Sequence, residues 1–286
     1  MPICALQSDF YRSNRPRVTL TLTQREAELA TRSFSTPKPT AAERWYLEPM
    51  PELHLHAERG EVAPFVLLPG DPDRARLIAE TFFSAPRLYT DYRGLLGYTG
   101  SYEGAEVSVQ TTGMGCPSLA IVTEELIRLG AKTLVRVGTA GIVAEAVNPG
   151  DLIVAHAAVP RDGTTRMYLG GDVCAPAASF AVTRALADAA PDAHVGLIQT
   201  EDAFYASRPE DVAGLQERGV LAVEMEASAL FLLGQLRGVE TGCALVASNR
   251  IGDAAFIDPA FLRERVLTMT RAALEAGLEL PRRENA

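Results

Sequence analysis

Residues 67–74 read LLPGDPDR, and this segment joins an apolar run to a helical pattern. The apolar run at 65–68 is typical of a buried strand, and the pattern that begins at Arg74 and reaches Ile78 is typical of a helix. The turn between them holds two prolines and one glycine. Glycine lets the backbone approach a ligand closely, and a helix N-terminus beside an arginine favours a bound anion. The segment therefore predicts either an anion pocket or an ordinary strand-to-helix turn.

Strand-like and helix-like segments alternate along the chain from about residue 52 onward. Such alternation is typical of an α/β fold in which helices flank a central sheet. We therefore expect residues 51–286 to form a single domain with a mixed, largely parallel sheet. The expected strands span 64–68, 107–111, 133–137, 152–158, 195–199, 220–223 and 243–247, and the expected helices span 72–83, 117–129, 178–189, 225–236 and 259–278.

Residues 1–50 differ in composition from the remainder of the chain. They contain seven Lys or Arg and five Asp or Glu, whereas the whole chain has a net charge of −9. The stretch 33–42 is rich in Ser, Thr, Pro and Ala, which is typical of a poorly ordered connector. We predict that residues 1–50 are a poorly ordered N-terminal extension.

Composition excludes several functional classes. The chain has 286 residues, of which 47% are hydrophobic and 22% are charged, as in globular proteins. It has no apolar run of transmembrane length and no apolar stretch of signal-peptide length near its start. The net charge of −9 argues against nucleic-acid and anionic-membrane partners. The four cysteines are widely spaced, so we expect a cytoplasmic protein without a metal site.

The glycine-rich loop at 113–115 lies between an expected strand and an expected helix. It lacks the third glycine of a dinucleotide-binding fingerprint, because Ser118 stands at that position. The chain also lacks the Gly-Lys-Ser/Thr ending of an ATP-binding phosphate loop. We therefore expect no nucleotide cofactor.

Four short motifs occur in a characteristic order: PGDPxR at 69–74, GMGCPS at 113–118, RVGTAG at 136–141 and EME at 224–226. With this spacing, residues 51–280 resemble the hexameric nucleoside phosphorylase family, which includes uridine, bacterial-type purine and archaeal methylthioadenosine phosphorylases. The resemblance implies the nucleoside phosphorylase fold and a pentosyltransferase of nucleoside salvage. It implies that inorganic phosphate is a co-substrate, that no cofactor is needed, and that the chain forms a homo-oligomer with the dimer as minimal unit, assembled as a trimer of dimers.

The resemblance also implies a phosphate site, whose residues are Gly70, Arg74, Arg93, Arg136 and Thr139. Planar guanidinium groups suit a phosphate dianion better than lysines do, because each binds two oxygens at once. By the same resemblance, Arg93 comes from a neighbouring subunit.

For the ribose, the resemblance implies His54, Met225 and Glu226. The carboxylate of Glu226 would accept hydrogen bonds from the 2′ and 3′ hydroxyls, and Met225 would lie under the sugar. His54 would reach the 5′-hydroxyl in a neighbouring subunit. Glu224 is expected to contact these residues and not the ligand itself.

We predict that the base site is formed by Phe204, Arg208, Asn249 and Arg250. The predicted catalytic residues are Arg136, Glu226 and Arg250. Bacterial-type purine enzymes carry an aspartate where this chain has Asn249, and an amide cannot donate a catalytic proton. The pair Asn249–Arg250 resembles uridine phosphorylases, although the Gln-x-Arg uracil readers of those enzymes are absent. We therefore expect uridine as the substrate, with a 6-oxopurine nucleoside such as inosine as the alternative.

Two further classes remain as alternatives. A nucleosidase of the same fold would use water in place of phosphate and should lack the phosphate arginines. A non-catalytic nucleoside-binding protein should have lost Glu226 or those arginines. The chain retains Arg74, Arg93, Arg136 and Glu226, which favours the phosphorylase.

Overall fold

The computed structural model describes residues 52–206, 209–253 and 257–280. The predicted N-terminal extension therefore lies outside the described residues. The strands are β1 (Phe65–Leu68), β2 (Ser84–Thr90), β3 (Gly97–Tyr102), β4 (Ala105–Gln110), β5 (Thr133–Ile142), β6 (Leu152–Pro160), β7 (His194–Thr200), β8 (Val220–Glu224) and β9 (Glu240–Arg250). The helices are α3 (Pro72–Phe82), α4 (Cys116–Leu129), α5 (Gly163–Tyr168), α6 (Phe180–Ala189), α7 (Val212–Glu217), α8 (Ala227–Arg237) and α9 (Pro259–Glu279).

The described strands form one sheet in the order β2-β3-β4-β1-β5-β8-β7-β6-β9, and β5 also pairs with β9. Strands β5, β8, β7, β6 and β9 consequently close into a ring. Five strand pairs are parallel and four are antiparallel, so the sheet is mixed. This confirms the predicted α/β fold with a mixed central sheet flanked by helices.

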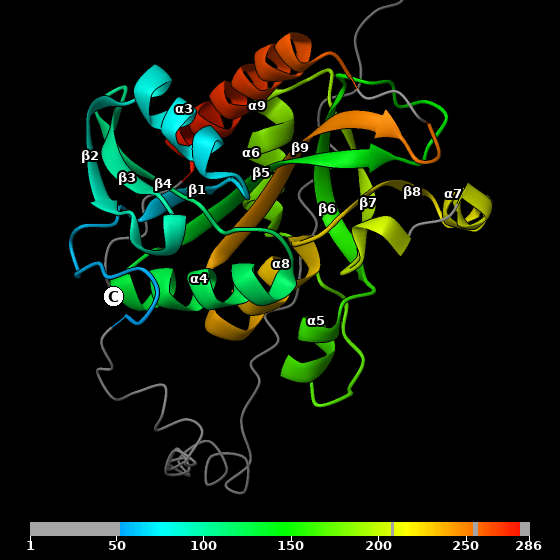
Figure 1. The fold of residues 1–286 in the computed structure, drawn as a ribbon, viewed down its shortest axis with the longest axis horizontal. Coiled ribbons are helices and arrows are strands. Elements are labelled where there is room, and N and C mark those ends of the chain that lie inside the picture. Colours follow the sequence, from blue (N-terminus) through cyan, green and yellow to red (C-terminus); the bar gives the residue numbers. More distant parts are fainter. Residues whose placement is uncertain (1–51, 207–208, 254–256, 281–286) are drawn as a thin grey trace, which may run out of the picture. The chain divides into compact units, whose positions relative to one another are not determined.

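Helices cover the sheet from two sides (Figure 1). One buried cluster joins α3, α6 and α9 to Leu67 and Val135, and the other joins α4 and α8 to Val66 and Leu134. Adjacent residues of β1 and β5 thus enter opposite clusters, as the alternation of side chains along a strand requires. Both strands are buried on both faces, which explains their continuous apolar sequences.

All seven predicted strands and all five predicted helices are present, and four elements were missed. Strands β2 and β3 form the antiparallel edge of the sheet. The first five residues of β2 are exposed and β3 contains two glycines, so neither carries a clear apolar pattern. The short helices α5 and α7 have six residues each, too few to show a helical period.

No helix among the described residues is long and apolar enough to cross a membrane. Within the same residues, no group of three or more His, Cys, Asp or Glu side chains is placed to hold a metal ion.

Candidate active site

A cavity of about 790 Å³ opens where several strands end. Its walls come from the turn after β1, the loop after β4, the carboxyl ends of β5, β8 and β9, and the segment after β7. In α/β sheets, ligands bind beyond the carboxyl ends of strands where connections diverge. Nine of the predicted site residues line this cavity: Gly70, Arg74, Arg93, Arg136, Thr139, Phe204, Met225, Glu226 and Asn249.

The turn after β1 begins helix α3 in the cavity wall. Asp71 caps the helix by accepting a hydrogen bond from the Asp73 N–H at 3.0 Å, and Pro72 occupies the first turn. At Gly70 an added Cβ would lie 3.1 Å from the Gly113 carbonyl oxygen. A side chain there would crowd the neighbouring glycine loop, which explains the glycine in physical terms.

Arg74 and Arg136 provide two positive charges to the same wall. The Nη1 of Arg74 donates to the Val137 carbonyl at 3.4 Å. Burial lowers the pKa of Arg74, and the charge of Arg136 acts in the same direction. An anion in the cavity would relieve this repulsion between two guanidinium groups, so the pair suits a phosphate.

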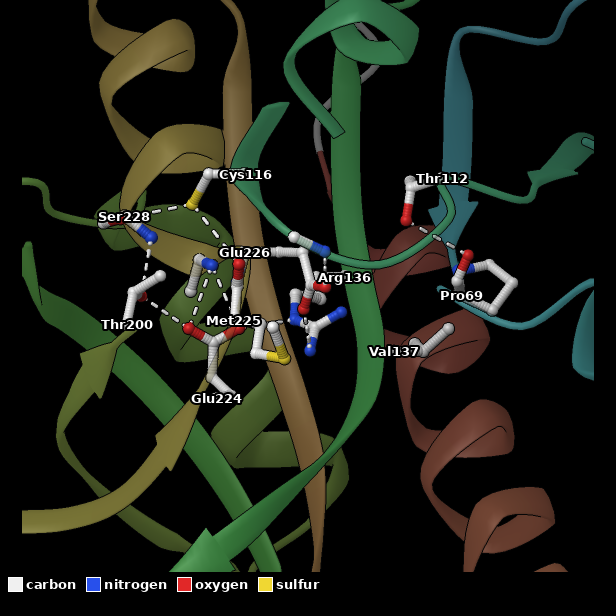
Figure 2. Close-up of polar contacts among 12 residues, drawn as sticks. Pro69, Thr112, Cys116, Arg136, Val137, Thr200, Glu224, Met225, Glu226 and Ser228 are labelled. Atoms are coloured by element: carbon white, nitrogen blue, oxygen red, sulfur yellow. Dashed lines mark hydrogen bonds and ion pairs between the residues drawn. The ribbon is translucent and has the colours of Figure 1, made fainter. Parts of the chain in front are cut away.

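Arg136 is held by two carboxylates, Glu224 at the end of β8 and Glu226 at the N-cap of α8, and Figure 2 shows its guanidinium beside both. Its Nε donates to Glu224 Oε2 at 2.8 Å, and its Nη2 lies 2.6 Å from Glu226 Oε2. Burial disfavours the charge of Arg136, but the two carboxylates outweigh that cost and raise the pKa of its guanidinium. The backbone of Gly138 gives the guanidinium its space, because an added Cβ would lie 2.8 Å from Arg136 Cζ.

Glu226 is the N-cap residue of α8 and is buried in the cavity wall. Its Oε1 accepts a hydrogen bond from the Gly115 N–H at 2.5 Å. Burial raises the pKa of Glu226, and Glu224 adds to this effect against the opposing charge of Arg136. A carboxylate has about four acceptor positions, so Glu226 retains capacity for hydroxyl donors such as those of a ribose.

The cavity is also lined by Phe204, Ser248, Asn249 and Ile251. The Oγ of Ser248 lies 3.0 Å from Asn249 Oδ1, and Asn249 Nδ2 donates to the Arg250 carbonyl at 3.3 Å. Phe204 is 60% exposed, so a flat ring can stack on it. The cavity wall thus combines an aromatic face with an amide, as recognition of a heterocyclic base requires.

Three predicted residues are not placed in this cavity. Arg250 is turned away, because its Nη1 and Nη2 donate to the carbonyls of Ala144 at 3.0 Å and Val147 at 2.9 Å. Arg250 therefore binds two backbone carbonyls and does not line the cavity in which its base contact was predicted. His54 lies outside the cavity lining, and its Nδ1 is 2.7 Å from Glu125 Oε1. Arg208 falls outside the described residues.

Arg93 lies in a short 3₁₀ turn, Tyr92–Gly94, with a positive φ of 58°, and it lines the cavity of its own chain. Its contribution from a neighbouring subunit, like that of His54, stays a prediction.

Sequence reasoning missed several side chains in the cavity wall, among them Asp71, Met114 and Glu201. Asp71 lies within the first motif, where its helix-capping position was the available signal. Glu201 directly follows β7, at the same edge of the sheet as the predicted residues. The Oε1 of Glu201 accepts a hydrogen bond from Gln199 Nε2 at 2.5 Å.

Comparisons with known proteins agree with this geometry. The sequence model of a family described as the phosphorylase superfamily matches residues 64–278. The chain belongs to this superfamily. The chain is 40% identical over 236 residues to a DeoD-type purine nucleoside phosphorylase of Clostridium perfringens. The match covers 80% of this chain and 99% of that protein.

Two further relatives of this phosphorylase carry the same name. The Clostridium novyi protein is 41% identical over 232 residues, covering 79% of this chain and 98% of that protein. A Bacillus cereus protein is 43% identical over 204 residues, covering 70% of this chain and 87% of that protein. The predicted membership of the nucleoside phosphorylase family is confirmed, and with it the enzyme class of pentosyltransferases that act on nucleosides and phosphate. The relatives match the inosine-type alternative better than the uridine expectation.

Proposed function

We propose that this phosphorylase cleaves purine nucleosides, and specifically 6-oxopurine nucleosides such as inosine, with inorganic phosphate as nucleophile. The observation that carries the proposal is the similarity to purine nucleoside phosphorylases over 98–99% of the length of two of them. The cavity supports it, because arginines, an aromatic ring and an amide line the same wall.

In the proposed reaction a phosphate oxygen attacks C1′ of the ribose, and the bond between C1′ and N9 breaks with its electron pair moving to the base. The departing base takes up one proton, and the attacking hydrogen phosphate gives one up, so the products are ribose 1-phosphate and hypoxanthine. Arg74 and Arg136 would hold the phosphate, and Glu226 would accept hydrogen bonds from the ribose hydroxyls. These groups act by positioning and by charge, without a covalent enzyme intermediate.

Asn249 distinguishes the proposed substrate from adenosine. Its amide can donate a hydrogen bond to N7 or O6 of a 6-oxopurine, which bear negative charge as the base departs. It cannot deliver a proton, so a base that needs protonation at N7 to leave would gain less from this site. The amide therefore supports a 6-oxopurine over an aminopurine.

A panel of inosine, guanosine, adenosine and uridine at saturating phosphate tests the proposal. The expected order has inosine and guanosine above adenosine, with uridine lowest. Uridine cleaved faster than inosine would overturn the proposed base and restore the uridine alternative.

A further inference from the structure

Glu224 accepts hydrogen bonds from four donors of the protein itself. Its Oε1 accepts from the Thr200 hydroxyl at 2.5 Å, and its Oε2 accepts from the Glu226 N–H at 2.9 Å. The Ala227 N–H lies 3.0 Å from both oxygens. With Arg136 Nε at 2.8 Å, the carboxylate of Glu224 is saturated and has one orientation.

Further buried polar groups form hydrogen bonds on the side of Thr200 that faces away from Glu224. Figure 2 shows the first of these contacts, between Ser228 and Thr200. The Thr200 hydroxyl accepts from the Ser228 N–H at 3.0 Å, so its single proton is directed to Glu224. The Ser228 hydroxyl donates to Asp162 Oδ2 at 2.6 Å, and Asp162 Oδ1 accepts from the Thr165 N–H at 2.6 Å. Thr200 and Ser228 are fully buried and Asp162 is 6% exposed.

We propose that Thr200, together with Ser228 and Asp162 behind it, positions Arg136 for phosphate by fixing the carboxylate of Glu224. None of the three lines the cavity, so they would act only through Glu224. The proposal rests on the proposed function in one respect, namely that Arg136 binds the phosphate.

The physical argument is the geometry of the guanidinium. Arg136 has a long side chain, and its direction is set by the bond from Nε to Glu224 and the contact from Nη2 to Glu226. If Glu224 can rotate, Arg136 loses one of these two restraints. Its remaining N–H groups then face the phosphate with the wrong angle, and a misplaced contact weakens binding and catalysis.

The test compares Thr200→Val with Thr200→Ser. Valine keeps the shape and removes the hydroxyl, whereas serine keeps the hydroxyl. We expect Thr200→Val to raise the KM for phosphate by about tenfold or more, the scale of one lost hydrogen bond to a charged group. The KM for inosine should change by less than about threefold, and Thr200→Ser should recover most of the loss.

Thr123→Val is the matched control. Thr123 is also fully buried, and its hydroxyl has no hydrogen-bond partner among the described residues. It therefore undergoes the same chemical change without a connection to Glu224, and its KM for phosphate should stay near that of the parent. Ser228→Ala provides a second, milder variant should Thr200→Val not fold, and we expect it to raise the KM for phosphate by about threefold.

An unchanged KM for phosphate in folded Thr200→Val or Ser228→Ala, or equal losses in Thr200→Val and Thr123→Val, would overturn the proposal. Failure of the proposed function is a separate result. It would be seen in the parent protein, either as base release that does not depend on phosphate or as faster cleavage of uridine than of inosine, and the variants would not be needed to see it.

Discussion

Nη2 of Arg136 lies 2.6 Å from Oε2 of Glu226, and both groups are buried in the wall of one cavity. Arg136 is the predicted phosphate ligand and Glu226 the predicted ribose ligand. The predicted phosphate ligand and the predicted ribose ligand are therefore joined in one ion pair. One arginine is shared by two carboxylates, which leaves the charge of Glu226 only partly compensated.

Glu226 should set the acid limb of the pH–rate profile. Burial raises its pKa above the ordinary value of 4.5, so the carboxyl takes up a proton at a higher pH than an exposed glutamate does. The protonated form is a poorer acceptor for ribose hydroxyls, and kcat/KM for inosine should fall as pH decreases through that raised pKa.

The variant Glu226→Gln should remove this limb and lower kcat/KM at every pH. The exposed Glu145→Gln is the control and should leave the limb in place. A limb that persists in Glu226→Gln would assign the titration to another group.

Gly138→Ala should impair phosphate use. The added Cβ would lie 2.8 Å from Cζ and Nη2 of Arg136, so the guanidinium must move. We expect the KM for phosphate to rise by about tenfold, since a contact to the nucleophile is misaligned. Gly214→Ala is the matched control, because its Cβ would meet only Arg218 Nη2 at 3.6 Å. Equal KM values for phosphate in both variants would contradict the position of Arg136.

Arg250→Ala should lower stability and leave base selectivity unchanged. Its guanidinium donates to the carbonyls of Ala144 and Val147, so the variant loses two charge-assisted hydrogen bonds. The free energy of unfolding in urea should fall by about 1–3 kcal/mol. Arg87→Ala is the control, because it breaks only an exposed ion pair with Glu61 and should lower the free energy of unfolding by about 0–1 kcal/mol. A changed inosine-to-uridine ratio in Arg250→Ala would show that Arg250 reads the base after all.

Asn249→Asp should raise adenosine cleavage relative to inosine. A carboxylic acid in the cavity wall can donate a proton to N7 of a departing adenine, which an amide cannot do. We expect the adenosine-to-inosine ratio of kcat/KM to rise by about tenfold or more, within the range of a positioned general acid. Asn249→Ala separates this gain from simple loss of the amide. An unchanged adenosine-to-inosine ratio would show that residue 249 does not set the base selectivity, and would point to the residues around Phe204.

The family resemblance implied a set of site residues that the structure brings together. Gly70, Arg74, Thr139 and Glu226 all line one cavity. They lie within or shortly after β1, β5 and β8, whose buried apolar sequences made these strands predictable.

Arg250 shows where such reasoning fails. Asn249 and Arg250 are neighbours in β9, yet only Asn249 lines the cavity. The guanidinium of Arg250 donates to the carbonyls of Ala144 and Val147, which lie 106 and 103 residues away in the sequence. A contact at that separation cannot be seen in the local pattern of β9.

The support behind Glu224 could not be predicted, because it depends on pairing between distant strands. Thr200 and Glu224 are register partners in β7 and β8, and Arg136 comes from β5, the next strand in the sheet. The edge strands β2 and β3 were missed for a different reason, since their exposed and glycine-containing sequences carry little apolar pattern.

The most direct test of the account is to follow inosine by phosphorus NMR and base release, with and without inorganic phosphate. The arginines of the cavity wall, Arg74, Arg93 and Arg136, predict that hypoxanthine appears only with phosphate, and that one ribose 1-phosphate forms for each hypoxanthine. Hypoxanthine release at the same rate in phosphate-free buffer, with free ribose as the product, would contradict it.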